Sequence, residues 1–149
     1  MKGQKGLTMV ELVVATAISG VIVTFLGTAI YQILNVTGYG NDRLIAAHEL
    51  ENAAYWFNLD GQQAATASGG SALTLIFSDN SSVAYTLSGA ELRRTSGSVY
   101  MVLARNIASL NFAVSSRVVT MAVTSTPPGR YAVSANGTYE VNLRPSGGG

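Results

Sequence analysis

A long uncharged apolar run dominates the first quarter of the chain. From Leu12 to Leu34 there are 23 residues without a charge or a proline. As a helix this run is about 34 Å long, enough to cross the roughly 30 Å hydrocarbon core of a membrane. Lys2 and Lys5 precede the run, and no charge follows it until Asp42. The pattern predicts a membrane-spanning helix with its N-terminus on the cytoplasmic side.

The helical pattern continues beyond this run, but in amphipathic form. Polar residues fall between apolar ones that recur at spacings of three, four and seven, the apolar set being Ala46, Leu50, Ala53, Phe57 and Ala64. His48, Asn52, Tyr55 and Gln62 fall on the other side. Gly38, Gly40 and Asn41 are a weak point, where Asp42 could cap a new helix. We expect one helix from about residue 7 to residue 63, with residues 7–34 apolar all round and residues 35–64 as an amphipathic extension.

Short strand-like segments fill the second half of the chain. Residues 65–71 consist of small residues and predict a linker. Alternating or β-branched segments follow at 72–77, 83–87, 91–95, 99–103, 110–114, 118–124, 131–133 and 139–143. Asn136-Gly137 predicts a hairpin turn between the last two. No helical segment separates the strands, so residues 72–145 predict an antiparallel β domain with a flexible tail at 146–149. The fold class is α+β, a long N-terminal helix packed against an antiparallel sheet.

Composition narrows the possible functions. Only 11% of residues are charged, against about 25% in ordinary soluble domains, and 48% are hydrophobic. The formal net charge is +1, and no basic face predicts a nucleic-acid site. Cysteine is absent, which excludes disulfides and thiolate metal sites.

Motifs of common enzymes are missing. His48 is the single histidine, and Asn52 stands where a two-histidine zinc motif needs its second ligand. There is no Gly-x-Ser-x-Gly elbow and no phosphate-binding loop with a lysine. Asp79 is better explained by turn capping than by calcium binding, and Trp56 by packing between helix and sheet. The sequence predicts no catalytic residue, no metal site and no cofactor, so the protein is not expected to be an enzyme.

The six residues from Gly6 to Glu11, with the sequence GLTMVE, carry the most specific signal in the chain. A basic leader ends in Gly6; an apolar residue, a threonine, two further apolar residues and Glu11 follow. This segment resembles the cleavage and methylation signal of type IV prepilins and pseudopilins. Leu7 replaces the phenylalanine that is commoner in that family.

The resemblance implies a role for each of three residues. A prepilin peptidase would remove residues 1–6 by cutting between Gly6 and Leu7, and would then methylate the new amino group of Leu7. Glu11 would pair with the N-terminal ammonium of a neighbouring subunit and set the register of the filament. A carboxylate in an apolar helix is costly without a partner, which suits this role. The alternative is that Glu11 only complements the positive end of the helix dipole.

A second, shorter resemblance covers the rest of the chain. The pieces at 85–87, 92–94, 107–112 and 141–144, together with the junction at 49–64, are similar to J/W-type minor pseudopilins and minor pilins. This implies a structural subunit of a type IV pilus, type II secretion or competence filament. Its partners would be other pilin or pseudopilin subunits, an inner-membrane assembly platform and, before assembly, membrane lipid. It would move from the cytoplasmic membrane, with the β domain outside, into a cell-surface or periplasmic filament.

The apolar run is also compatible with two other kinds of membrane segment. A secretory signal peptide would use Gly27-Thr28-Ala29 as its cleavage site and leave Ile30 as the N-terminus. An uncut anchor would keep Met1. Removal of residues 1–6 would leave seven arginines against eight acidic residues, a net charge of −1, and no lysine. The alternative function is a single-pass, membrane-anchored binding module with an extracytoplasmic β domain.

Overall fold

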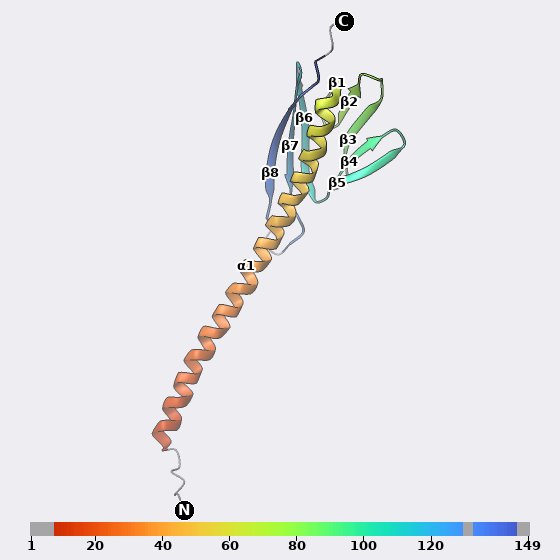
Figure 1. Ribbon diagram of the computed structural model, residues 1–149. Coiled ribbons are helices and arrows are strands. Elements are labelled where there is room, and N and C mark those ends of the chain that lie inside the picture. The colour runs from red at the N-terminus through yellow and green to blue at the C-terminus, as the bar shows by residue number, and fades with distance from the viewer. Residues whose placement is uncertain (1–7, 130–132, 146–149) are drawn as a thin grey trace, which may run out of the picture. The chain divides into compact units, whose positions relative to one another are not determined.

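The computed structural model describes residues 8–129 and 133–145, and it has the α+β architecture that the sequence predicts (Figure 1). Within these residues one helix, α1 (Met9–Gln63), precedes all the strands. The strands are β1 (Ala64–Ser68), β2 (Leu73–Phe77), β3 (Ser82–Ser88), β4 (Glu91–Ser96), β5 (Val99–Ala104), β6 (Ile107–Ser115), β7 (Val118–Ser125) and β8 (Ala135–Asn142). The chain divides into two units, Met1–Gly38 and Tyr39–Gly149.

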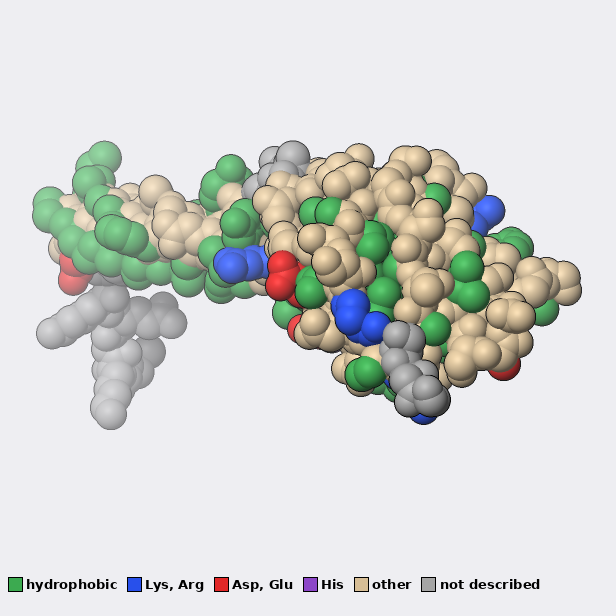
Figure 2. All heavy atoms as spheres, turned by 90° about the horizontal axis from the view of Figure 1, so that it is seen from above, with side chains coloured by type: hydrophobic (Ala, Val, Ile, Leu, Met, Phe, Trp, Pro, Cys, Tyr) green, Lys and Arg blue, Asp and Glu red, His purple; other side chains and the backbone are tan. Residues whose placement is uncertain are grey.

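The part of α1 in the first unit is exposed at every position up to residue 34 and is rich in apolar side chains (Figure 2). By length and composition α1 can cross a membrane. Four of its hydroxyl groups are satisfied within the helix, because Thr16, Ser19, Thr24 and Thr28 donate to backbone carbonyls three or four residues earlier at 2.8–3.0 Å. These side chains therefore need no water, and they suit an apolar environment.

The part of α1 in the second unit buries the predicted stripe. Ala46, Leu50, Ala53 and Phe57 are at most 4% exposed, whereas the four residues predicted on the other side are exposed. The helix also continues through Gly38 and Gly40, so no new helix begins at Asp42. The amphipathic pattern and the single helix are thus confirmed, and the weak point at Gly38, Gly40 and Asn41 does not interrupt α1.

Two antiparallel sheets share a core with this half of α1. One sheet has the order β1-β2-β3-β4-β5 and the other β6-β7-β8. Phe112 of β6 is the centre of the aromatic contacts, with its ring 6.4 Å from that of Phe57 and 6.3 Å from that of Tyr85. One hydrophobic cluster therefore joins the helix to both sheets.

The residues after β8 connect the two sheets. The amide of Leu143 donates to the carbonyl of Arg117 at 2.8 Å, beside β7. The amide of Arg144 donates to the carbonyl of Ala64 in β1 at 3.0 Å. The end of the β region thus lies beside its beginning.

The expected linker at 65–71 is wrong for most of its length. Residues Ala64–Ser68 form β1, which pairs antiparallel with β2. Small side chains serve close packing here: a Cβ on Gly69 would lie 2.8 Å from the side chain of Val114 and 3.0 Å from the carbonyl oxygen of Phe112. The small-residue pattern marks a crowded strand and turn, and not a loose connection.

The expected hairpin turn at Asn136-Gly137 is also wrong. Both residues lie inside β8, where they pair with Thr124 and Val123 of β7. A Cβ on Gly137 would lie 2.6 Å from the ring of Tyr139, so glycine makes room for this ring and does not provide a turn. The predicted strand at 131–133 falls mostly outside the described residues. The other predicted strands are confirmed, with ends that shift by at most four residues.

Candidate assembly site

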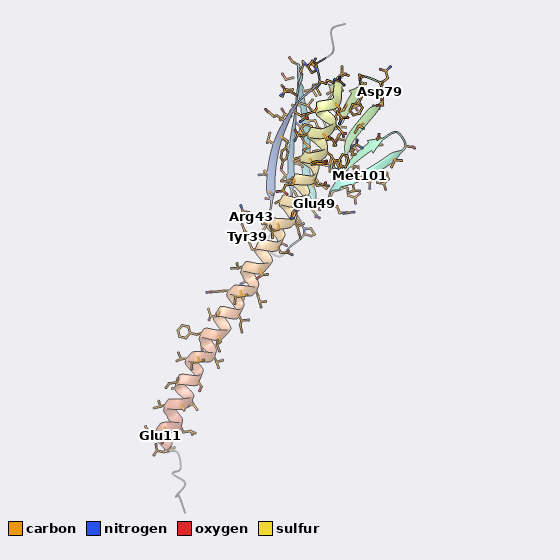
Figure 3. All side chains as sticks on the ribbon, viewed as in Figure 1. Glu11, Tyr39, Arg43, Glu49, Asp79 and Met101 are labelled. Carbon is orange, nitrogen blue, oxygen red and sulfur yellow. The ribbon has the colours of Figure 1, made fainter. Side chains whose placement is uncertain are left out.

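Glu11 lies at the start of α1 (Figure 3) and forms a reciprocal capping arrangement with Thr8. The backbone amide and the hydroxyl of Thr8 donate to Oε2 of Glu11 at 2.8 and 2.9 Å. The amide of Glu11 in turn donates to the hydroxyl oxygen of Thr8 at 3.3 Å. This is a capping box, which satisfies amide groups that have no partner within the helix. Glu11 therefore caps the N-terminus of α1 within the chain.

The other two predicted site residues, Gly6 and Leu7, lie outside the described residues. Their relation to Glu11 stays a prediction. The carboxylate of Glu11 accepts its hydrogen bonds on Oε2, while Oε1 accepts none from the residues that the structure describes. Among the described residues, one oxygen of Glu11 is thus engaged and the other has no donor.

A second cluster lies where α1 meets the five-stranded sheet. Nε of Arg94 donates to Oδ2 of Asp60 at 2.6 Å, and Nη2 donates to Oδ1 at 2.8 Å. The hydroxyl of Tyr85 also donates to Oδ2 of Asp60. Asp60 is only 4% exposed, so its charge depends on these three donors.

The electrostatics of this cluster follow from burial and hydrogen bonding. Burial raises the pKa of Tyr85, and the hydrogen bond to Asp60 raises it further. The hydrogen bonds to Asp60 raise the pKa of Arg94. The guanidinium of Arg94 also lies over the ring of Trp56, 5.0 Å from its centroid. The cluster is therefore a fixed ion pair that joins β3 and β4 to the helix.

Sequence reasoning placed Asp60 only at the end of the helix and did not identify this cluster. A signal was present, because Asp60 follows Phe57 by three residues and precedes Ala64 by four, on the buried stripe of the helix. A carboxylate at such a position requires partners. Their identity depends on pairing across 25 and 34 residues, which no local pattern specifies.

Side chains of α1 also contact the outer edge of the five-stranded sheet. Nδ2 of Asn52 donates to the carbonyl of Leu103, and the amide of Arg105 donates to Oε2 of Glu49 (Figure 3). These bonds occupy part of the free edge of β5. The other end of β5 carries exposed apolar residues, with Val99 at 71% and Tyr100 at 58%.

The remaining candidate residues have structural roles. The side chain of His48 is 79% exposed, and its Nδ1 lies 3.6 Å from Oε2 of Glu51. Asp79 accepts hydrogen bonds from the amide and the hydroxyl of Ser81, as turn capping predicts, and these bonds lower its pKa. No group of three or more potential metal ligands occurs in the part of the chain that the structure describes.

Comparison with known proteins gives one match. The family described as "Prokaryotic N-terminal methylation motif" matches residues 1–27. No curated protein and no solved structure matches the chain. The matched motif implies processing by prepilin peptidase and assembly with other pilins, and the family that carries this motif is structural. With the apolar part of α1 it also suggests membrane anchoring. The match is to residues 1–27, and it supports a relation of this N-terminal part of the chain to type IV pilin-like proteins.

Proposed function

We propose that this protein is a minor pilin or pseudopilin, a structural subunit that is stored in the cytoplasmic membrane and then assembled into a filament. The observation that carries the proposal is a carboxylate, Glu11, at the head of an apolar and exposed helix that begins in a methylation motif. In this arrangement the leader 1–6 is removed after Gly6. Leu7 becomes the methylated N-terminal residue, and Lys2 and Lys5 keep the N-terminus in the cytoplasm before cleavage.

Glu11 then has two successive sets of partners. In the unassembled subunit Thr8 supplies hydrogen bonds to Oε2. During assembly the ammonium group of Leu7 from a neighbouring subunit approaches the open oxygen. Both charges are costly without a partner in an apolar bundle, so their pairing selects one stagger between neighbouring helices.

The surface of the apolar helix suits packing against a neighbouring helix in a filament. At 3.6 residues per turn, one face carries only small or hydroxyl-bearing residues between positions 16 and 28: Thr16, Ala17, Gly20, Thr24, Gly27 and Thr28. The opposite face carries Ile18, Ile22, Phe25, Leu26 and Ile33. A Cβ on Gly20 or Gly27 would meet no atom within 4 Å, so neither glycine is required by packing within the chain. Each glycine costs a helix about 1 kcal/mol relative to alanine, and close approach of another helix explains why the sequence keeps both.

The test compares two glutamate variants of the same helix in the native host. Glu11→Gln keeps the shape of the side chain and removes its charge. Glu51→Gln makes the same change at a position with a 74% exposed side chain in the second unit and serves as the control. We expect both variants to insert into the membrane, while only Glu11→Gln is lost from filaments that are sheared from the cells and measured by immunoblotting. Equal incorporation of Glu11→Gln and the parent would contradict the role of Glu11. N-terminal sequencing of the mature chain tests cleavage separately, with methylated Leu7 expected.

A further inference from the structure

A polar pocket lies at the C-terminal end of α1, where the helix meets the β2–β3 turn. Its volume is about 370 Å³, within the usual range of about 300–1,000 Å³ for small-molecule sites. Its charged and planar lining residues are Asp60, Gln63, Asp79, Arg94 and Arg144, and Phe77 adds an aromatic ring. Val83 and three serines complete the lining. Figure 3 shows Asp79 at the rim formed by the β2–β3 turn.

The floor of the pocket is rigid and still has hydrogen-bonding capacity. Arg94 donates two of its five N–H groups to Asp60, which leaves three for other acceptors. Stacking on Trp56 fixes the plane of the guanidinium. A guanidinium that is held by a two-bond ion pair and by an aromatic ring keeps its remaining donors in place, which favours a ligand with several acceptor oxygens.

The charges that line the pocket cancel. The positive charges of Arg94 and Arg144 are equal in number to the negative charges of Asp60 and Asp79. Asp60 and Arg94 are already paired with each other, and Asp79 is bonded to Ser81. A free anion or a metal ion would meet an opposing charge at each attractive group. A neutral ligand with many hydroxyl groups meets both donors and acceptors without this penalty.

We propose that this pocket binds a neutral carbohydrate unit of a surface glycan. Vicinal hydroxyls of a sugar ring match the planar, two-pronged geometry of the guanidinium, carboxylate and amide groups. The apolar face of the ring packs on Phe77. The pocket would give the subunit an adhesive function that is independent of Glu11 and of the filament helix.

The test uses the purified full chain in detergent micelles and four neutral sugars: glucose, galactose, mannose and N-acetylglucosamine. Saturation-transfer difference NMR measures binding of each sugar, with acetate and inorganic phosphate as anionic probes. Gln63→Ala removes one lining amide. Gln62→Ala is the matched control, since Gln62 is the preceding residue of α1, is exposed and does not line the pocket.

We expect saturable binding of at least one sugar, weakened about three- to tenfold by Gln63→Ala, as one lost hydrogen bond predicts, and unchanged by Gln62→Ala. Three outcomes would overturn the proposal: no saturable binding of any of the four sugars, equal effects of the two variants, or binding of acetate or phosphate in preference to the sugars. None of these outcomes bears on filament incorporation, which the Glu11 variants test separately.

Discussion

Asp60 and Arg94 are joined by two parallel hydrogen bonds, of 2.6 and 2.8 Å, at the junction of α1 and the five-stranded sheet. Their side chains are only 6% and 18% exposed. A buried pair of this kind need not stabilise a fold relative to apolar residues, but the loss of one partner leaves an uncompensated charge. The pair therefore determines which residues meet at the junction, and the removal of one partner should strongly destabilise the fold.

Arg94→Ala is expected to lower the free energy of unfolding by about 3–5 kcal/mol, because it leaves the carboxylate of Asp60 without its main partner. Urea denaturation of the full chain in detergent micelles, followed by circular dichroism, measures the change. Arg93→Ala is the control, since Arg93 points to the other face and pairs with Glu91 near the surface; its effect should stay below about 1 kcal/mol. Similar losses in both variants would show that the buried pair has no special role.

The hydrogen bond from Tyr85 to Asp60 predicts a loss of stability in alkaline solution. The pKa of Tyr85 is raised above its ordinary value of 10.0 by burial and by Asp60. Above pH 10 the unfolded chain releases this proton while the folded chain retains it, so stability is complete below pH 10 and falls as the pH rises. The slope is at most about 1.4 kcal/mol per pH unit for one group.

Tyr85→Phe should remove this part of the slope in urea denaturation between pH 9 and pH 11. Tyr55→Phe changes a tyrosine that is 62% exposed and should leave the slope as it is in the parent. If Tyr85→Phe kept the full slope, another group would be responsible.

Two glycines of α1 predict opposite effects of the same substitution. A Cβ on Gly61 would overlap Cγ1 of Val141 in β8, so Gly61→Ala should destabilise the second unit by about 1–3 kcal/mol through overpacking. A Cβ on Gly40 would meet no atom within 4 Å, so Gly40→Ala should stabilise the helix by up to about 1 kcal/mol. Thermal unfolding of the two variants measures both signs. A stabilising Gly61→Ala would mean that the helix does not approach β8 as closely as described.

A substitution at Ser125 is expected to raise the stability of the protein. Its side chain is fully buried, and its hydroxyl has no hydrogen-bond partner within the described ranges 8–129 and 133–145. Ser125→Ala removes a desolvated polar group and should raise the free energy of unfolding by about 1 kcal/mol. The exposed Ser109→Ala should change it by less than about 0.5 kcal/mol. A clear loss of stability in Ser125→Ala would reveal a partner for the hydroxyl.

The parts of the fold that follow a local period were predictable from the sequence. The stripe from Ala46 to Phe57 identified the buried face of α1, and most strands alternate clearly enough to be located. Features that depend on distant contacts were not predictable. The small residues of Ala64–Ser68 form a strand because β2 lies beside them, and Gly137 is a glycine because Tyr139 covers it.

The division into two sheets and the Asp60 cluster have the same cause. Nothing local indicates that pairing stops between β5 and β6, so the sequence predicted a single sheet. At the N-terminus the sequence is more informative than the structure. Six consecutive residues predicted the roles of Gly6, Leu7 and Glu11, while the structure adds only the capping of Glu11 by Thr8.

The hydrogen bond between Arg144 and Ala64 has a consequence for how this unit opens. Because the last residues of the β region bond to both sheets, detachment of the C-terminal segment removes a neighbour from β1 and from the end of β7 at the same time. Strands therefore cannot peel away one by one from this end. Opening of the unit begins with a coupled event that spans both sheets, and hydrogen exchange should show the amides of β1 and β7 exchanging together.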